Sequence, residues 1–424
     1  MIGQRMLVPT NEKKSHFFYG YIVILASFLI MLISWGSQYS YGVFFKPVLN
    51  EFNWSRAVTS GAFSINMILT GAFSILAGRI ADRFGPRLVL SISGLIVGIA
   101  FILMARVSTI WQYYLDYGVL LSIGLSGIVV PLMSNVSRWF TSRRGLASGI
   151  VISGIGMGVI VVPQVANSLI STFDWRKSFI ILGIAAFILI VGFAQLLRRA
   201  PVQKIITNRE VSSSETSSSN VQVQGLSTVQ AMRTRQFWII CLIALFLTYG
   251  VQTIMVHIVA HATDIGYSAT TSATILSAIG IVSIIAKIFM GSLGDKISNR
   301  NVMIIISIIL VLVFIWLRIA TDLWMLYLFA AVFAFAYAGW SANQPPLVAE
   351  YFGLKSHGTL YGLVQFAGFI GGSLGVFLGG YIFDRSDSYD WVFISCAVIG
   401  VVSLIFSIWL KPALRQYRFR LKPN

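Results

Sequence analysis

The sequence has little charge, and most of the charge it has is of one sign. Of its 424 residues, 11% are charged and 57% are hydrophobic, whereas soluble domains have roughly 25% charged residues. So few charges exclude a soluble globular protein and a charge-rich disordered one. Basic residues outnumber acidic ones, 31 to 14. The excess does not indicate nucleic-acid binding, because the basic residues separate apolar segments and do not form a soluble basic face.

Cysteine and the common catalytic patterns are also scarce. The two cysteines, Cys241 and Cys396, lie far apart inside apolar runs, which excludes a disulfide framework and a cysteine metal site. The chain has no phosphate-binding Gly-Lys-Ser/Thr loop, no nucleophile elbow and no carboxylate pair spaced as in hydrolases. We therefore expect no enzyme activity, no metal, no cofactor and no use of ATP.

What the sequence does contain is a series of apolar runs long enough to cross a bilayer. About 20 apolar residues are needed to span the hydrocarbon as a helix. We predict an all-α membrane protein with twelve spans, near 18–45, 56–78, 87–106, 109–137, 143–168, 176–197, 236–262, 269–291, 300–319, 322–350, 357–383 and 389–411.

A polar stretch divides these spans into two equal sets. Residues 198–235 include a serine-rich segment, 212–219, with little apolar content, which is typical of a flexible linker. We predict an N-terminal six-helix bundle at 1–197, a linker at 198–235, and a C-terminal six-helix bundle with its tail at 236–424.

The basic residues also predict the orientation in the membrane. The termini, the linker and the even-numbered loops contain 23 Lys and Arg, the odd-numbered loops contain 7, and Lys287 lies inside a span. Basic residues concentrate in cytoplasmic loops, so we expect both termini and the linker to be cytoplasmic. The first apolar run has no small-residue cleavage site after it, so we expect no removed signal peptide.

One short motif occurs in both halves. Gly78-Arg79-Ile80-Ala81-Asp82-Arg83-Phe84-Gly85-Pro86-Arg87 follows the second span, and Gly291-Ser292-Leu293-Gly294-Asp295-Lys296-Ile297-Ser298-Asn299-Arg300 follows the eighth. Equal placement in both halves is typical of internal repeats. Glycine permits close helix approach, and an Asp at a helix end can accept amide hydrogen bonds or pair with Arg. The alternative is an ordinary short loop rich in Gly and Arg.

This motif resembles the signature loop of the major facilitator superfamily. The resemblance implies two pseudo-symmetric six-helix bundles that move by alternating access, with the loop locking the outward-open state. It assigns gating roles to Gly78, Asp82, Arg83, Gly85, Arg87, Gly291 and Asp295. The second copy departs from the pattern at Ser298 and Asn299, where a glycine and a basic residue are usual.

Lys287 is the one cation far from the ends of its predicted span, and no acidic residue lies within one helical turn of it. A charge at the centre of a span costs at least ~2.5–3.5 kcal/mol. One interpretation is a lysine that extends to the cytoplasmic face. The other is a fixed cation in a central cavity that binds an anion, since a lone ammonium gains most from a carboxylate partner.

Four stretches resemble monocarboxylate transporters and the oxalate:formate antiporter, namely Tyr41–Pro47, Val256–Asp264, Lys287–Gly291 and Tyr361–Gln365. In that branch an arginine occupies the position of Lys287 and contacts the substrate carboxylate. Lysine is a departure, because it lacks the bidentate fork and can release its proton. In the oxalate carrier a second cation follows the fourth stretch, where this chain has Gly368, which favours one carboxylate over two.

Other polar residues within or near the spans are candidates for the same site. By resemblance, Tyr117 and His257 face the cavity; Ser283 shares a helix face with Lys287, and Asn66 and Tyr337 are polar groups within spans. Asp116, His257 and Lys287 itself are candidates for carrying a proton. The alternatives are helix–helix hydrogen bonds for the polar groups and, for Asp116, an ion pair with Arg106 near the outer interface.

Together these observations predict a secondary transporter of a small lactate- or pyruvate-like monocarboxylate, coupled to protons. We expect a monomeric functional unit in the plasma or inner membrane. The alternatives are a dicarboxylate or organic-anion exchanger of the oxalate:formate type, a proton-coupled drug or sugar carrier, and a receptor or scaffold that transports nothing. Drug exporters typically bury acids to bind cations, whereas this chain buries a cation.

Overall fold

The computed structural model describes residues 18–52, 54, 56–200, 225–386 and 388–411, and these residues are almost entirely helical. The terminal tails and the serine-rich part of the predicted linker lie outside the described residues. The helices of the first half are α1 (Gly20–Tyr39), α2 (Tyr41–Phe52), α3 (Arg56–Phe84), α4 (Pro86–Met104), α5 (Ile110–Tyr113), the π-helical segment η1 (Tyr114–Leu120), α6 (Leu121–Trp139), α7 (Arg144–Phe173) and α8 (Trp175–Gln195).

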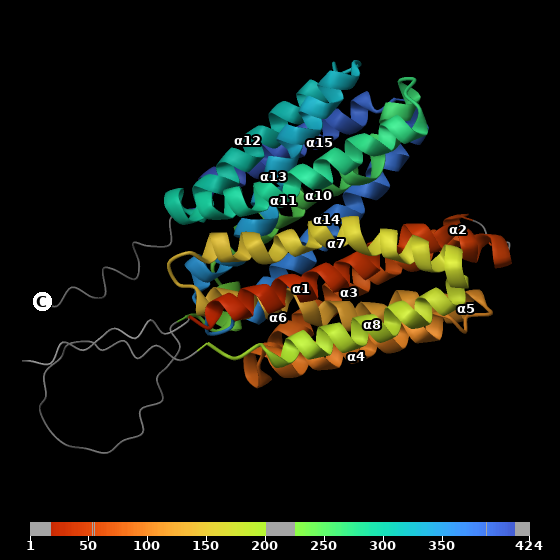
Figure 1. Cartoon of the computed structure of the whole chain (residues 1–424). Helices are drawn as coiled ribbons and strands as arrows, with labels where there is room; N and C mark the ends of the chain where they lie inside the picture. Colours follow the sequence, from red (N-terminus) through yellow and green to blue (C-terminus); the bar gives the residue numbers. More distant parts are fainter. Residues whose placement is uncertain (1–17, 53, 55, 201–224, 387, 412–424) are drawn as a thin grey trace, which may run out of the picture.

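The second half begins with a short helix at the edge of the predicted linker. Its helices are α9 (Thr228–Met232), α10 (Arg235–Asp264), α11 (Ala269–Ile297), α12 (Asn299–Leu317), α13 (Leu323–Phe352), α14 (His357–Ser386) and α15 (Asp390–Trp409). Figure 1 shows α10 to α15 as one bundle beside the bundle of α1 to α8. Twelve helical stretches of the described chain are long and apolar enough to cross a membrane. The predicted fold class is confirmed.

The two bundles repeat each other with a constant offset along the chain. α4 and α12 are both 19 residues long, and α7 and α14 are both 30 residues long. The sequence separation between the first residues is the same in both pairs, and it equals the separation of Gly78 from Gly291 in the short motif. The continuous helix α13 begins at this same separation from α5. The offset found for the motif therefore holds for whole helices.

The predicted loop after the second span is mostly helix, and here the predicted boundary was wrong. α3 continues through Gly78 to Phe84, and α11 continues through Gly291 to Ile297. In each half the chain then reverses direction at a single residue of positive φ, which is Gly85 (94°) in the first half and Ser298 (76°) in the second. An apolar run marks the hydrocarbon thickness and not the helix end, so polar residues extended both helices beyond the predicted spans.

Ser298 adopts a backbone conformation that suits glycine, since a Cβ is disfavoured at positive φ by roughly 1–2 kcal/mol. Its hydroxyl accepts only a long 3.5 Å hydrogen bond from Asn301 N. We expect Ser298→Gly to stabilise the protein by about 1 kcal/mol and to raise its thermal midpoint. Ser91→Gly, inside the regular helix α4, should lower it. Equal shifts in both variants would contradict this account.

Two irregular segments were not predicted. The first span breaks at Ser40, so that α2, with Pro47 inside it, forms a separate helix. The fourth span contains the π-helical turn η1, whereas the equivalent residues of α13 are α-helical. Such π-helical turns are frequent at functional sites, and η1 contains both Asp116 and Tyr117.

The bundles meet chiefly through two helix pairs, α3 with α14 and α7 with α11, and in addition α13 contacts α6 and α7, and α14 contacts α6. We call the end of the molecule that bears the turns at Gly85 and Ser298 the linker end. Leu226, at the described edge of the linker, donates to the carbonyl of Phe352 at this end. In Figure 1 the bundles lie close together at the linker end and diverge toward the opposite end.

Candidate functional site

Lys287 lies at the junction of the two bundles and is 1% exposed. A Cβ added to Gly149 of α7 would overlap the Lys287 carbonyl oxygen, so the backbones of α7 and α11 touch at this point. The ammonium lies 4.9 Å from the centroid of the Tyr337 ring, and no carboxylate of the described residues lies within 4.0 Å of it. The side chain does not reach the surface, so the interpretation as a surface-seeking lysine does not fit this conformation.

Ser283 and Tyr337 belong to the same bundle as Lys287. Ser283 is one turn away on α11, is 1% exposed, and donates to the carbonyl of Gly280 at 2.7 Å. The ring of Tyr337, on α13, faces the ammonium and stabilises it through its π electrons. Such a contact replaces only part of the hydration of an ammonium, so the group remains able to bind an anion.

Asn66 and Tyr117 belong to a hydrogen-bonded ring in the N-terminal bundle. Gln38 donates to Asn66 Oδ1 at 2.7 Å, Asn66 donates to the Tyr117 carbonyl at 2.9 Å, and the Tyr117 hydroxyl donates to the Gln38 carbonyl at 3.4 Å. Asn66 is 0% and Tyr117 2% exposed. In this conformation the ring fixes the π-helical turn η1. No sequence pattern indicates Gln38, because an uncharged amide in an apolar helix resembles any helix–helix contact.

Asp116 and His257 lie in different environments. Asp116 is 9% exposed, and no ion pair joins it to Arg106, which is exposed. The predicted alternative of an Asp116–Arg106 pair is therefore wrong. The described contacts of His257 are within its own bundle: Nε2 lies 3.2 Å from the Val376 carbonyl oxygen and Nδ1 lies 3.4 Å from the Tyr389 hydroxyl.

Asp82 and Asp295 make equivalent contacts across the junction at the linker end. Asp82 accepts from Gly358 N at 3.1 Å and Thr359 N at 3.0 Å, in the first turn of α14. Asp295 accepts from Gly145 N at 2.8 Å and Leu146 N at 2.9 Å, in the first turn of α7. Each carboxylate thus binds the N-terminus of a helix in the opposite bundle, where unpaired amides and the helix dipole favour an anion.

The glycines of the motif allow these contacts. A Cβ on Gly78 would overlap the carbonyl oxygen of Gly358, and a Cβ on Gly291 would overlap that of Gly145. Gly85 makes the turn into α4, and Arg87 donates to Gln195 within its own bundle at 2.6 Å. The motif therefore closes the linker end by backbone contact.

Arg138, and not Arg83, is the basic partner of Asp82. Arg138 Nη2 lies 2.6 Å from Asp82 Oδ1. Arg83 is exposed, and its guanidinium stacks on Phe84 at 5.2 Å. The available signal for Arg138 was a basic residue directly after the predicted fourth span, in what is the last turn of α6, but the sequence alone does not show which helix ends meet.

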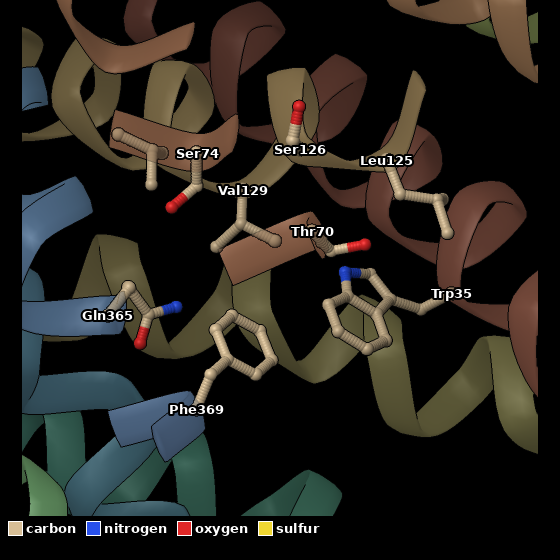
Figure 2. Close-up of a pocket in the computed structure, with 9 residues that line it drawn as sticks. Trp35, Thr70, Ser74, Leu125, Ser126, Val129, Gln365 and Phe369 are labelled. Atoms are coloured by element: carbon tan, nitrogen blue, oxygen red, sulfur yellow. The ribbon is translucent and has the colours of Figure 1, made fainter. Parts of the chain in front are cut away.

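A small pocket also lies between the bundles, near the middle of α3 (Figure 2). Its lining comes from three helices of the first half and from α14 of the second, and consists of Trp35, Thr70, Ser74, Leu125, Ser126, Val129, Val130, Gln365 and Phe369. Lys287 is not among these residues. In the part of the chain that the structure describes, no group of three or more His, Cys, Asp or Glu could hold a metal ion.

Comparison with known proteins agrees with this architecture. The sequence pattern of the Major Facilitator Superfamily matches residues 27–280 and 242–423. The chain is 27% identical to the uncharacterized MFS-type transporter YhjX of Escherichia coli K12, over 87% of this chain and 88% of that protein. It is 23% identical to the oxalate:formate antiporter of Oxalobacter formigenes (93% and 92%) and 23% identical to mouse monocarboxylate transporter 12 (94% and 87%).

Solved structures show the same fold. The proton:xylose symporter XylE superposes with a TM-score of 0.74 at 14% identity, covering 93% of this chain and 96% of that one. The Escherichia coli fucose:proton symporter FucP superposes with a TM-score of 0.70 at 13% identity, covering 93% and 100%. The family predicted from the repeated motif and the four similar stretches is confirmed. The chain is a multi-pass membrane transporter and belongs to the major facilitator superfamily.

Proposed function

We propose that the protein is a secondary active transporter of small organic monocarboxylates, with Lys287 as the anchor for the carboxylate. The observation that carries the proposal is a fully buried ammonium at the bundle junction, with no carboxylate of the described residues beside it. A buried unpaired charge is costly and is retained where it has a function. The similarity to monocarboxylate transporter 12 and the oxalate:formate antiporter supports an organic anion as its partner.

The contacts at the linker end support alternating access as the mechanism. Two carboxylates and two glycine pairs join the bundles there, and the bundles diverge toward the opposite end (Figure 1). The excess of basic residues in the termini, linker and even-numbered loops supports a cytoplasmic linker end. With this orientation we assign the structure to an outward-facing state and the protein to the plasma or inner membrane. Gly78, Asp82, Gly85, Gly291 and Asp295 then act as the cytoplasmic gate, with Arg138 in the role first given to Arg83.

Proton coupling follows from the use of lysine as the anchor. If the empty carrier holds Lys287 without its proton, one proton and one monocarboxylate together leave the cavity neutral, and the carrier can return. Asp116 and His257 are the other candidates for this proton, although the described contacts of His257 are with α14 and α15. We also propose the division at residues 197 and 235, and a monomeric functional unit that contains the whole pathway.

Uptake by proteoliposomes tests the proposed function. An inward proton gradient should drive accumulation of labelled lactate or pyruvate above the equilibrium level, and collapse of the gradient should abolish the accumulation. Lactate-loaded vesicles should not take up oxalate or malonate in exchange. Exchange of dicarboxylates without an effect of pH would instead favour the anion exchanger. Binding without movement of any carboxylate would favour a receptor or scaffold.

A further inference from the structure

The pocket between the bundles contains polar groups that no hydrogen bond satisfies. Thr70 is 6% exposed, and its hydroxyl is buried without a partner. The Trp35 indole nitrogen and the Gln365 amide also have no hydrogen bond to any described residue. Figure 2 shows the Thr70 hydroxyl and the Trp35 nitrogen directed toward each other across the pocket, with the Gln365 amide on the other side of Phe369.

The two serines of the pocket use only part of their hydrogen-bonding capacity. Ser74 donates its hydrogen to the Gly71 carbonyl at 2.7 Å, and Ser126 donates to the Ile123 carbonyl at 2.8 Å, which leaves their oxygen lone pairs available as acceptors. An unsatisfied buried polar group destabilises a protein. The pocket is therefore suited to a guest that both donates and accepts hydrogen bonds.

The size of the pocket limits this guest. The space has room for a group about the size of one water molecule. A hydroxyl group meets this limit, whereas a planar carboxylate has two oxygens and a negative charge for which the lining offers no cation.

The internal repeat relates this pocket to Lys287. With the offset that relates Gly78 to Gly291, Ser74 is the counterpart of Lys287, and Thr70 is the counterpart of Ser283. The backbone contacts agree: a Cβ on Gly149 would overlap the Lys287 carbonyl oxygen, and a Cβ on the equivalent Gly362 would lie 2.9 Å from the Ser74 carbonyl oxygen. The junction thus has two equivalent faces, one with a cation and one with uncharged hydroxyl groups.

Each face also has aromatic side chains beside its polar groups. On the α3 face, the ring of the pocket residue Trp35 lies 5.8 Å from the ring of Tyr39, both on α1. On the α11 face, the Tyr337 ring contacts the Lys287 ammonium.

We propose that this pocket is the subsite for a hydroxyl group of the transported monocarboxylate, with Thr70, Trp35 and Gln365 determining specificity. The inference rests on the proposed function, because it takes the carboxylate to be at Lys287. It divides the substrate into a charged end, bound on the α11 face, and a hydroxylated end, bound on the α3 face. Hydroxylated monocarboxylates are then preferred over alkyl acids and over dicarboxylates.

Calorimetric binding of a series of four-carbon acids to the purified full-length protein tests the proposal. Butyrate, 2-, 3- and 4-hydroxybutyrate present the hydroxyl at successive distances from the carboxylate. One hydroxy acid should bind about tenfold more tightly than butyrate. Thr70→Val keeps the shape of the side chain. It should lower the affinity for that hydroxy acid about five- to tenfold and change the affinity for butyrate less than twofold. Thr253→Val is the matched control, since Thr253 is 0% exposed and its hydroxyl donates to the Tyr249 carbonyl.

The remaining outcomes of this experiment overturn either the subsite or the proposed function. Equal affinity of the wild-type protein for all four acids, or no effect of Thr70→Val, means that the pocket holds only water and overturns the subsite. If Thr70→Val lowers the affinity for butyrate and for the hydroxy acids equally, Thr70 has a structural role, and the subsite is again overturned. If the wild-type protein binds none of the four acids, the carboxylate anchor itself fails, and with it the proposed function.

Discussion

Lys287→Met is expected to abolish saturable uptake of monocarboxylates, with a loss of affinity of about 30-fold or more. Removing one partner of a buried charge pair costs ~2–5 kcal/mol in binding, and the described residues around Lys287 offer no second cation within the same contacts. Methionine keeps much of the volume and removes only the charge. Initial rates in proteoliposomes and equilibrium binding in detergent measure the effect.

The stability of this variant separates a binding role from a structural one. A lysine buried without a carboxylate destabilises the empty protein, so Lys287→Met should melt at the same temperature as the wild type or higher. Lys177→Ala, at an exposed lysine with a weak 3.8 Å ion pair, should leave uptake unchanged. Normal uptake by Lys287→Met would show that the anchor lies elsewhere.

The Lys287→Arg variant tests which group carries the coupled proton. Arginine keeps the positive charge and does not lose its proton in proteins, so this variant should retain part of the binding. Its affinity should depend less on pH than that of the wild type if the lysine takes up the proton. An unchanged pH dependence would move the proton to Asp116 or His257.

The long apolar runs made the fold predictable, because the bilayer sets the length of a span. Lys287 was also identifiable, since one charge in an apolar helix is conspicuous. Helix ends were less predictable: polar residues continue α3 to Phe84 and α11 to Ile297. The turn at Ser298 shows a further limit, because it repeats the positive φ of Gly85 without a glycine.

Contacts between distant segments were the least predictable part of the site. Gln38, Asn66 and Tyr117 come from three separate spans, and single polar residues have no pattern that shows their partners. The pocket at Thr70 is defined by an absence of hydrogen bonds, which only a structure reveals. The Asp82–Arg138 pair depended on knowing which helix ends meet.

Gly291→Val is expected to stop transport by preventing closure of the linker end. A Cβ at this position would overlap the carbonyl oxygen of Gly145 and lie 3.4 Å from Gly149 Cα. Both neighbours are backbone atoms of α7, so no side chain can move aside. Separating α7 from α11 would also break the two hydrogen bonds that Asp295 accepts from Gly145 N and Leu146 N. Overpacking of ~1–3 kcal/mol and loss of two bonds to a charged acceptor together disfavour the closed state by more than ~100-fold.

The expected phenotype of Gly291→Val is opposite to that of Lys287→Met. Uptake should fall to background, while equilibrium binding in detergent stays within a few fold of the wild type, because the anchor is intact. Spin labels at Arg87→Cys and Lys355→Cys, two exposed positions on opposite bundles at the linker end, should report a shift to longer distances. Gly192→Val is the matched control, since a Cβ there meets nothing within 4 Å. Normal uptake with unchanged label distances in Gly291→Val would show that the α7–α11 contact is not the gate.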